Sequence, residues 1–191
     1  MIGPVVVSFY TPEWEYRSRA LALAKQCEEM GLRHDFRPME STGNWLRNTA
    51  LKATFIHRLL QQYEHIIWSD CDGVFMARPT LALDHAAAEP VMAVPHQGLP
   101  RNWQVSCLSF RRTPESLALV ARWAGYAREN EVTDELAFHI VTTEMPGLVA
   151  SLPTSYCGLP KHGVYPKGTV YAVGLSKSPD KMALKAKKGQ K

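Results

Sequence analysis

Two acidic residues, Asp70 and Asp72, follow an apolar run in the stretch HIIWSDCDGVF, residues 65–75. In an extended chain the side chains of residues i and i+2 point to the same side. Both carboxylates can therefore approach one hard cation, such as Mg²⁺ or Mn²⁺, and such a cation commonly also binds phosphate oxygens. The pattern predicts a strand that ends in a cation site for a phosphate-containing ligand.

The composition is that of a globular protein, with 191 residues of which 46% are hydrophobic and 21% charged. We expect a single domain over residues 1–177 and a basic, flexible tail over residues 178–191, because the length suits one well-buried core. A signal peptide and a transmembrane segment are not expected, since no run approaches the necessary apolar length. We therefore expect a cytoplasmic protein, with four widely spaced cysteines that are free thiols.

Positive charge is concentrated toward the carboxyl end. Residues 161–191 hold eight lysines and one acid, Asp180, a balance of +7 in a chain of net charge +4. The first 160 residues therefore sum to −3, which is +4 less +7. Such a Lys-rich tail is most often simply solvated, but it is also suited to a polyanionic acceptor, a nucleic acid or an acidic membrane surface. The sequence leaves these alternatives open.

Hydrophobic periodicity predicts strands that alternate with helices in the first part of the chain. Residues 4–10 form a β-branched and aromatic run typical of a strand. Residues 14–30 carry an apolar stripe and precede Gly31, a pattern typical of an amphipathic helix and its end. We then expect a strand over residues 33–39, a helix over residues 47–62 and a strand that ends at Asp70.

Beyond the acidic pair the same signals continue. The expected elements are a short helix over residues 79–88, buried strands over residues 91–95 and 105–110, helices that start at Thr113 and Thr133, and a short strand over residues 169–173. This order favours an α/β fold with one Rossmann-like, mixed, mostly parallel sheet flanked by helices. Ligands of such sheets bind beyond the carboxyl ends of the strands, so residues 11–13 are expected beside Asp70 and Asp72.

Five segments, in this order, resemble the pattern of GT-A fold glycosyltransferases, especially the retaining glycogenin-like and galactosyltransferase-like families. They are VVVSFYT, NTALKATFIHRLL, HIIWSDCDGVFMARP, VSCLSF and TDELAFHIV, and the resemblance covers residues 4–177. It implies a GT-A fold and transfer of a hexose or pentose from a nucleotide diphosphate sugar, most often a uridine diphosphate (UDP) sugar, with retention. It also implies Mn²⁺ or Mg²⁺ as cofactor.

The same resemblance implies roles for residues near the donor. Tyr10 and Thr11 would bind the nucleoside, and Lys52 would approach the donor. Asp70 would contact both ribose and metal, and Asp72 would hold the metal.

Asp134 and Glu135 stand where these families have an Asp-Gln pair that contacts the transferred sugar. The glutamate matters chemically, because a carboxylate can stabilise an oxocarbenium-like state or act as a nucleophile, whereas an amide offers only its carbonyl oxygen. The alternative is structural, because acids in the first turn of a helix after the N-cap Thr133 also suit the helix dipole.

One departure from the family pattern lies near the carboxyl end. The families have HxxGxxK there, and this chain has Tyr171, Gly174 and Lys177. The resemblance implies that Lys177 contacts the diphosphate and that Gly174 also belongs to the donor-binding site, but the histidine that serves as third metal ligand is replaced by tyrosine. A phenol with a pKa near ~10 is a poor ligand for Mn²⁺ at neutral pH. Two alternatives remain: the two aspartates, water and diphosphate hold the metal alone, or another residue, such as His162, substitutes for the histidine.

The remaining aromatic and histidine residues are expected to be mainly structural. Trp103 is able to stack on a sugar, but a tryptophan beside a strand packs in the core more often, and the same holds for Trp14, Trp45 and Trp123. His57, His65, His85 and His139 have no partners at ligand spacing.

Two other functions compete with sugar transfer. The string DCDGVF also fits the motif of aspartate-nucleophile phosphatases, with Asp70 as phosphoryl acceptor and Asp72 as acid and base. Against this, a complete strand-helix-strand-helix unit precedes the motif, and residues 128–131 before Asp134 do not form a strand pattern. The third candidate is a non-catalytic module that keeps a sugar-nucleotide fold, which the absent histidine and small size would suit.

Overall fold

The computed structural model describes residues 3–13, 15–96, 103–161 and 164–173. Its elements are β1 (Val5–Tyr10), α1 (Tyr16–Glu29), β2 (Arg33–Pro38), α2 (Trp45–Leu60), β3 (His65–Ser69), β4 (Val74–Phe75), α3 (Thr80–Leu83), β5 (Val91–Pro95), β6 (Trp103–Arg111), α4 (Pro114–Asn130), α5 (Asp134–Glu144), β7 (Val149–Ser151), the 3-10 helix η1 (Thr154–Tyr156) and β8 (Tyr171–Ala172). Six strands form one sheet in the order β2-β1-β3-β6-β5-β7, and β4 pairs with β8 in a second, small sheet.

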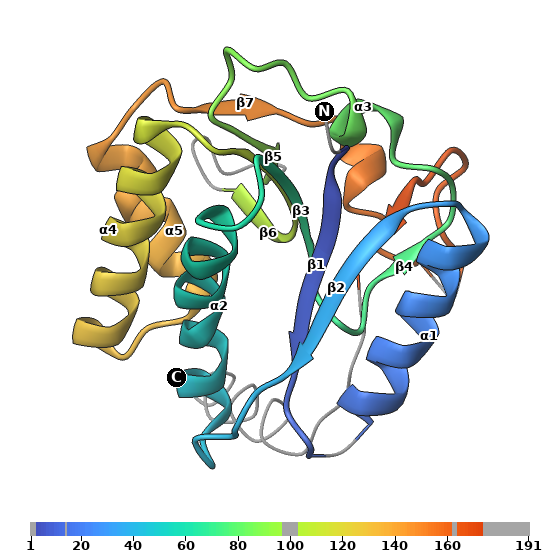
Figure 1. Cartoon of the computed structure of the whole chain (residues 1–191), viewed down its shortest axis with the longest axis horizontal. Helices are drawn as coiled ribbons and strands as arrows, with labels where there is room; N and C mark the ends of the chain where they lie inside the picture. The colour runs from blue at the N-terminus through green and yellow to red at the C-terminus, as the bar shows by residue number, and fades with distance from the viewer. Residues whose placement is uncertain (1–2, 14, 97–102, 162–163, 174–191) are drawn as a thin grey trace.

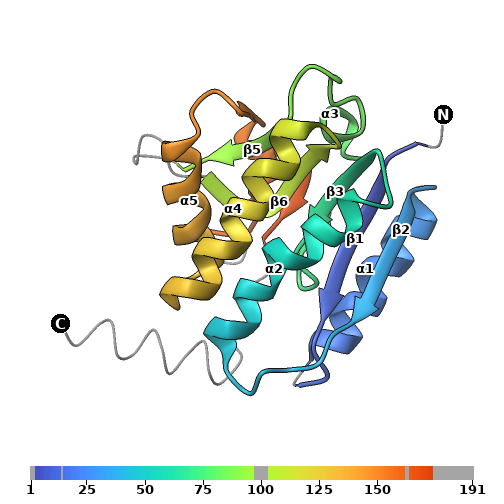
Figure 2. The ribbon, with the colours of Figure 1, turned by 60° about the vertical axis from the view of Figure 1, so that its left-hand side comes forward.

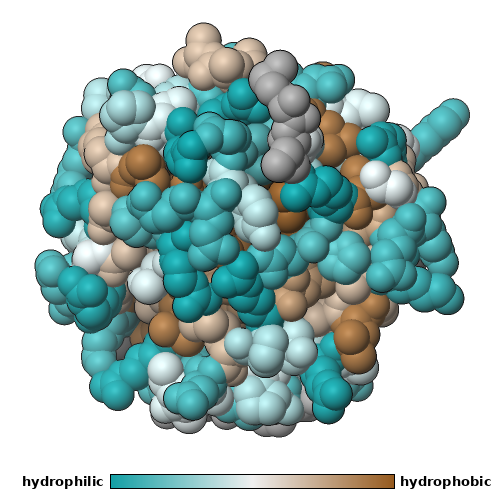
Figure 3. All heavy atoms as spheres, viewed as in Figure 1, coloured by the Kyte–Doolittle hydropathy of each residue, from teal (hydrophilic) through white to brown (hydrophobic). Residues whose placement is uncertain are grey.

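Helices cover both faces of the central sheet. Figures 1 and 2 show α2, α4 and α5 together on one face and α1 on the other. The face drawn in Figure 3 is mostly hydrophilic, with apolar side chains in small separate patches. No helix among the described residues is both long and apolar enough to cross a membrane.

Alternation along the central strands divides the core between the two faces. Val5 and Val7 of β1 pack in the cluster under α2, α4 and α5, whereas Val6 between them packs in the cluster on the α1 side. Ile66 and Ile67 of β3 divide in the same way. Because successive strand side chains point to opposite faces, a continuous apolar run such as β3 fits a sheet that is covered on both sides.

The prediction of a mixed, mostly parallel sheet is confirmed. β1 is parallel to both β2 and β3, while β6 is antiparallel to both β3 and β5. The reversal follows from the length of the connection, because only residues 96–102 separate β5 from β6, too few for the crossover that parallel neighbours need. The start of β6 therefore lies at the same edge of the sheet as the end of β3.

The helix starts predicted at Thr113 and Thr133 are confirmed. The sequence prediction was wrong for the short elements. Thr113 accepts a hydrogen bond from the Ser116 amide as N-cap of α4, and Thr133 accepts one from the Leu136 amide as N-cap of α5. The helix expected over residues 79–88 is only the single turn α3. The strands β4 and β7 were not predicted, because two or three residues are too few to show a periodic pattern.

Two histidines form a buried polar network at the end of β3 that is remote from Asp70. His65 and His85 both lie 2.9 Å from the Ser109 hydroxyl, and Arg111 donates to Nδ1 of His65 at 3.1 Å. Since Ser109 donates to the Ala82 carbonyl at 3.2 Å, its hydroxyl accepts from both rings, and His65 must be neutral because its Nδ1 accepts from Arg111. Burial, with the neighbouring Arg111 charge, lowers the pKa of each histidine to about 4.

We predict that the free energy of unfolding falls as the pH is lowered from ~6.5 to 4. Between these values the unfolded histidines bind protons that the folded ones exclude, so each contributes a slope of about 1.4 kcal/mol per pH unit. Urea denaturation across this range should show a shallower slope for His65→Gln than for the wild-type protein. The variant His57→Gln, on α2 outside the network, is the control, and equal slopes for both variants would contradict the prediction.

Candidate active site

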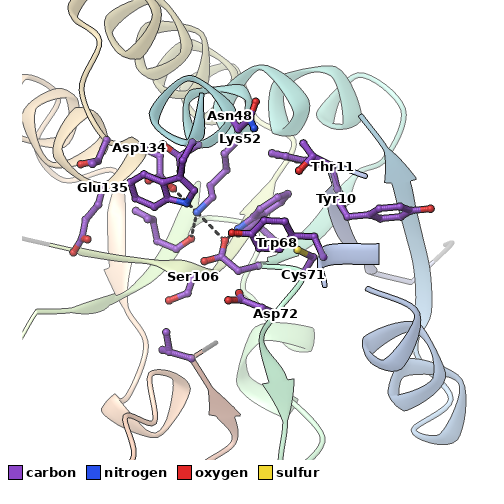
Figure 4. A pocket seen from close by; sticks show the side chains of 18 of the residues that line it. Tyr10, Thr11, Asn48, Lys52, Trp68, Cys71, Asp72, Ser106, Asp134 and Glu135 are labelled. Carbon is purple, nitrogen blue, oxygen red and sulfur yellow. Dashed lines mark hydrogen bonds and ion pairs between the residues drawn. The ribbon is translucent and has the colours of Figure 1, made fainter. Parts of the chain in front are cut away.

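A cavity of about 290 Å³ opens at the edge of the sheet where β1 and β3 end and β6 begins. Every predicted site residue that the structure describes lines it, namely Tyr10, Thr11, Lys52, Asp70, Asp72, Asp134 and Glu135 (Figure 4). They come from four separate parts of the chain: the end of β1, the middle of α2, the turn after β3 and the start of α5. Gly174, Lys177, His162 and the tail over residues 178–191 lie outside the described residues.

Lys52 occupies the centre of the cavity floor. Its ammonium group forms ion pairs with Oδ1 of Asp70 at 2.8 Å and with Oδ2 of Asp134, and donates to the Val105 carbonyl at 3.1 Å. Figure 4 shows these three interactions converging on Nζ. An ammonium group has three hydrogens, so each of them has an acceptor here. Contact with a donor molecule would require Lys52 to exchange one of these partners.

The charge of Lys52 is maintained by its partners although the side chain is only 6% exposed. Burial alone would lower its pKa, but the carboxylates of Asp134 and Asp70 outweigh that effect and raise it above the usual value. The buried ammonium therefore remains charged and links the turn after β3 to the first turn of α5.

Asp70 presents one oxygen to the protein and the other to the cavity. Its Oδ1 accepts from Lys52 and, at 3.0 Å, from the indole of Trp68. No hydrogen bond from the described residues reaches Oδ2, and the side chain is 30% exposed. Burial raises the pKa of Asp70 to about 6, partly offset by Lys52 and reinforced by the neighbouring carboxylates of Asp72 and Asp134.

The residue between the two acids, Cys71, also lines the cavity. Burial and the flanking carboxylates of Asp72 and Asp70 raise the pKa of its thiol. The thiolate is the reactive form of cysteine, so this thiol is not activated as a nucleophile at neutral pH. All four cysteines are free, as expected.

Asp134 and Glu135 open α5 but have different surroundings. Asp134 is buried, paired with Lys52, and its carbonyl accepts from the indole of Trp123 at 2.9 Å. Glu135 is exposed at the cavity wall, and none of the described residues forms a hydrogen bond or ion pair with it. Partial burial and then the Asp134 carboxylate raise the pKa of Glu135.

Tyr171 lies beneath the acidic turn. It is fully buried, and its hydroxyl donates to the Ser106 carbonyl at 2.9 Å. Burial and the nearby Asp70 charge raise its pKa well above the usual value, so it stays protonated. Within the described residues no cluster of three or more His, Cys, Asp or Glu side chains is arranged to hold a metal. Of the residues predicted to bind a metal, the structure describes Asp70 and Asp72, and both line the cavity.

Several cavity residues were missed by the sequence prediction. Trp45, expected in the core, lines the cavity, whereas Trp123 is fully buried and Trp103 packs against the core. The segment Gln104, Val105 and Ser106 was not predicted because β6 runs antiparallel, which places its start rather than its end at the ligand-binding edge. If the change of strand direction between β5 and β6 had been recognised in the sequence, these residues would have been predicted to line the cavity.

Comparison with solved structures identifies the fold class. The chain is similar to a glycosyltransferase involved in the glycosylation of the major capsid of PBCV-1, with a TM-score of 0.69 and 10% identity over 92% of this chain and 96% of that chain. It is also similar to the galactosyltransferase LgtC in complex with donor and acceptor sugar analogs, with a TM-score of 0.62 and 10% identity over 97% and 94% of the two chains. Mouse xyloside xylosyltransferase 1 gives a TM-score of 0.56 and 9% identity over 94% and 100%.

The chain therefore has the GT-A fold of glycosyltransferases, as its resemblance to that class predicted. No protein-family profile and no curated protein matches its sequence. Identities near 10% establish the fold, and the reaction has to be argued from the cavity.

We predict that Lys52→Met destabilises the protein by about 3 kcal/mol or more at pH 8, because it leaves the buried carboxylate of Asp134 and the partly buried carboxylate of Asp70 unpaired. The loss should be smaller at pH 5. The pKa of Asp70, which burial already raises to about 6, rises further without Lys52, so folding then favours its protonated form more strongly and stability declines as the pH rises.

Chemical denaturation at both pH values measures the effect. Lys25→Met is the control, because Lys25 is 76% exposed and pairs with Glu29 at 3.8 Å on the surface of α1. That change should alter stability by no more than about 0.5 kcal/mol. Equal effects of the two substitutions would refute a structural role for the buried ammonium.

Proposed function

We propose that this protein is a metal-dependent glycosyltransferase that transfers a hexose or pentose from a nucleotide diphosphate sugar, preferably a UDP sugar, with retention of configuration. The observation that carries the proposal is the single cavity that joins the strand-end acids Asp70 and Asp72 to the helix-start acids Asp134 and Glu135. One pair is suited to a cation and a diphosphate, and the other to a sugar undergoing substitution.

The charge of the cavity supports the need for a cation. Among the described residues, its lining includes four carboxylates, of Asp70, Asp72, Asp134 and Glu135, against one ammonium, of Lys52. A diphosphate would meet net repulsion in such a site, since like charges at short range oppose binding. A divalent cation reverses this, and carboxylate oxygens are the ligands that Mn²⁺ and Mg²⁺ accept.

The residues present fit such an ion. Oδ2 of Asp70 has no hydrogen bond from the described residues, and Asp72 lines the same cavity two residues away. When bound, Mn²⁺ or Mg²⁺ would supply Lewis-acid stabilisation of the charge that develops on the departing diphosphate. The chain itself keeps Asp70 in place through Lys52 and Trp68, so that the carboxylate is oriented before any ligand binds.

The order of residues along the cavity supports an orientation for the donor. In Figure 4, Thr11 and Tyr10 lie on one side of Lys52, and Glu135 lies on the other. Aromatic side chains such as Phe9 and Trp45 also line the cavity and are suited to pack against a base or sugar ring. We infer that the nucleoside binds near Tyr10 and Thr11 and that the transferred sugar lies near Glu135.

Asp134 and Glu135 divide the catalytic work in this proposal. Asp134 is committed to Lys52, so it holds the first turn of α5 and the ammonium in place. Glu135 has no hydrogen bond or ion pair within the described ranges, and it lines the cavity. Its carboxylate is the group we infer to stabilise positive charge at the anomeric carbon, or to attack that carbon, as the bond to diphosphate breaks.

We predict that Asp72→Ala lowers the release of nucleoside diphosphate from the donor by more than ~10²-fold, because several kcal/mol of charge stabilisation are lost. A thermal-shift panel of nucleotide sugars, with and without Mn²⁺, first identifies the donor, and turnover of that donor is then measured. The Mn²⁺-dependent shift should also disappear in the variant.

The control is Asp84→Ala, which removes an exposed carboxylate at the end of α3. Retained turnover in Asp72→Ala would remove the role of the paired acids. Donor binding without turnover by the wild-type protein would favour the non-catalytic module, and phosphate release from a simple phosphomonoester would favour the phosphatase.

We predict that Glu135→Gln lowers turnover on the order of 10²-fold, as expected when a group that stabilises transition-state charge is lost. The affinity for the donor should change only a few-fold, because the amide keeps the size of the side chain. Steady-state kinetics and donor titration separate the two effects. Glu144→Gln, at the exposed end of the same helix, is the matched control; a glutamine variant with full activity would reject a catalytic carboxylate at this position.

A further inference from the structure

Tyr171 occupies the sequence position where a metal-binding histidine was expected, yet its surroundings assign it a different task. It belongs to β8, which pairs with β4 immediately after the acidic turn, and Phe75 of β4 packs against its ring at a centroid distance of 5.3 Å. The side chain is fully buried. Its hydroxyl donates to the Ser106 carbonyl at 2.9 Å and lies 3.2 Å from the Ser69 hydroxyl.

These contacts surround the backbone of the acidic turn. The Ser106 carbonyl that accepts from Tyr171 also accepts from the Asp70 amide at 2.9 Å. The Asp70 carbonyl accepts from the Gly73 amide at 2.9 Å and from the Ser69 hydroxyl at 3.1 Å. The phenol, the end of β3 and the start of β6 therefore share one set of hydrogen bonds that fixes where the turn begins and closes.

Gly73 shows how closely the phenol approaches this turn. A Cβ atom built on Gly73 would overlap the hydroxyl and ring carbons of Tyr171. Close approach of a buried ring to backbone is one of the situations that require glycine. The glycine of the DCDG stretch is thus explained by packing against Tyr171, with no appeal to phosphatase chemistry.

We propose that Tyr171 is a positioning residue that holds the turn carrying Asp70 and Asp72 in the geometry that binds a divalent cation, without itself contacting the cation or the donor. This inference rests on the proposed function. It accounts for a cation site to which the described part of the chain offers the two carboxylates of this turn, because a rigid turn presents both to one ion without a loss of backbone freedom on binding.

The test is the affinity for Mn²⁺ in the presence of saturating uridine diphosphate, followed by the electron paramagnetic resonance signal of the free ion. Tyr171→Phe keeps the ring and removes the hydrogen bond to Ser106. We expect it to weaken Mn²⁺ binding about 3- to 10-fold, the range of a single lost hydrogen bond. At saturating Mn²⁺ the turnover of donor should return to within about twofold of the wild-type value, because the loss is one of binding.

Tyr156→Phe is the matched control. Tyr156 is also buried, belongs to the same core cluster, and accepts a hydrogen bond from the Leu81 amide at 3.0 Å, away from the acidic turn. It should lower thermal stability without changing Mn²⁺ affinity. Ser69→Ala, which removes the second hydroxyl at Tyr171, should also weaken Mn²⁺ binding and serves if Tyr171→Phe does not fold.

The outcomes separate this inference from the function on which it rests. Wild-type protein that binds Mn²⁺ with uridine diphosphate, and hydroxyl variants that bind it equally well, would overturn the positioning role alone. A wild-type protein that binds no Mn²⁺ would overturn the proposed function and this inference together. If Tyr156→Phe weakens Mn²⁺ binding as much as Tyr171→Phe does, the effect is a general loss of stability, and the inference is overturned.

Discussion

The buried ammonium of Lys52 is the interaction on which the cavity depends. It joins Asp70, at the end of β3, to Asp134, at the start of α5, two carboxylates that would repel each other if left alone. A buried ion pair of this kind stabilises the fold only when both partners are present, and it strongly specifies geometry. The same contacts leave Oδ2 of Asp70 and the whole carboxylate of Glu135 without hydrogen bonds from the described residues. Neighbouring acids thus differ in how far their oxygens are bonded within the protein.

The reversed strand β6 is the second constraint. Because it runs antiparallel to β3, its first residues meet the carboxyl ends of β1 and β3. Its backbone then provides the acceptors that the site needs: the Val105 carbonyl for Lys52 and the Ser106 carbonyl for both the Asp70 amide and Tyr171. These groups carry no side-chain signature, since any residue type offers the same carbonyl.

Much of the fold and of the candidate site could be predicted from the sequence. The apolar run before Asp70 identified β3, the threonines before α4 and α5 marked their starts, and the seven predicted site residues within the described ranges share one cavity. The roles of those residues remain predictions. Short elements such as β4 and β7 escaped prediction because their pairing is set by distant strands. Trp45 was expected in the core but lines the cavity. The sequence of α2 does not show whether an aromatic residue on this helix faces the core or the cavity.

The sequence by itself determined the local features: strand and helix periodicity, helix caps, and a pair of acids directly after a strand. These depend on neighbours within a few residues, which the chain places together in any fold. The sequence did not show that Asp70 and Asp72 lie in a turn, in which the Gly73 amide donates to the Asp70 carbonyl, rather than in extended chain. Only the tertiary structure decided that Lys52 is saturated by two carboxylates, that Tyr171 is buried under the turn, and that Gly73 must be glycine. Each of these depends on contacts between residues far apart in the chain, whose geometry is set by how the whole sheet and its helices pack.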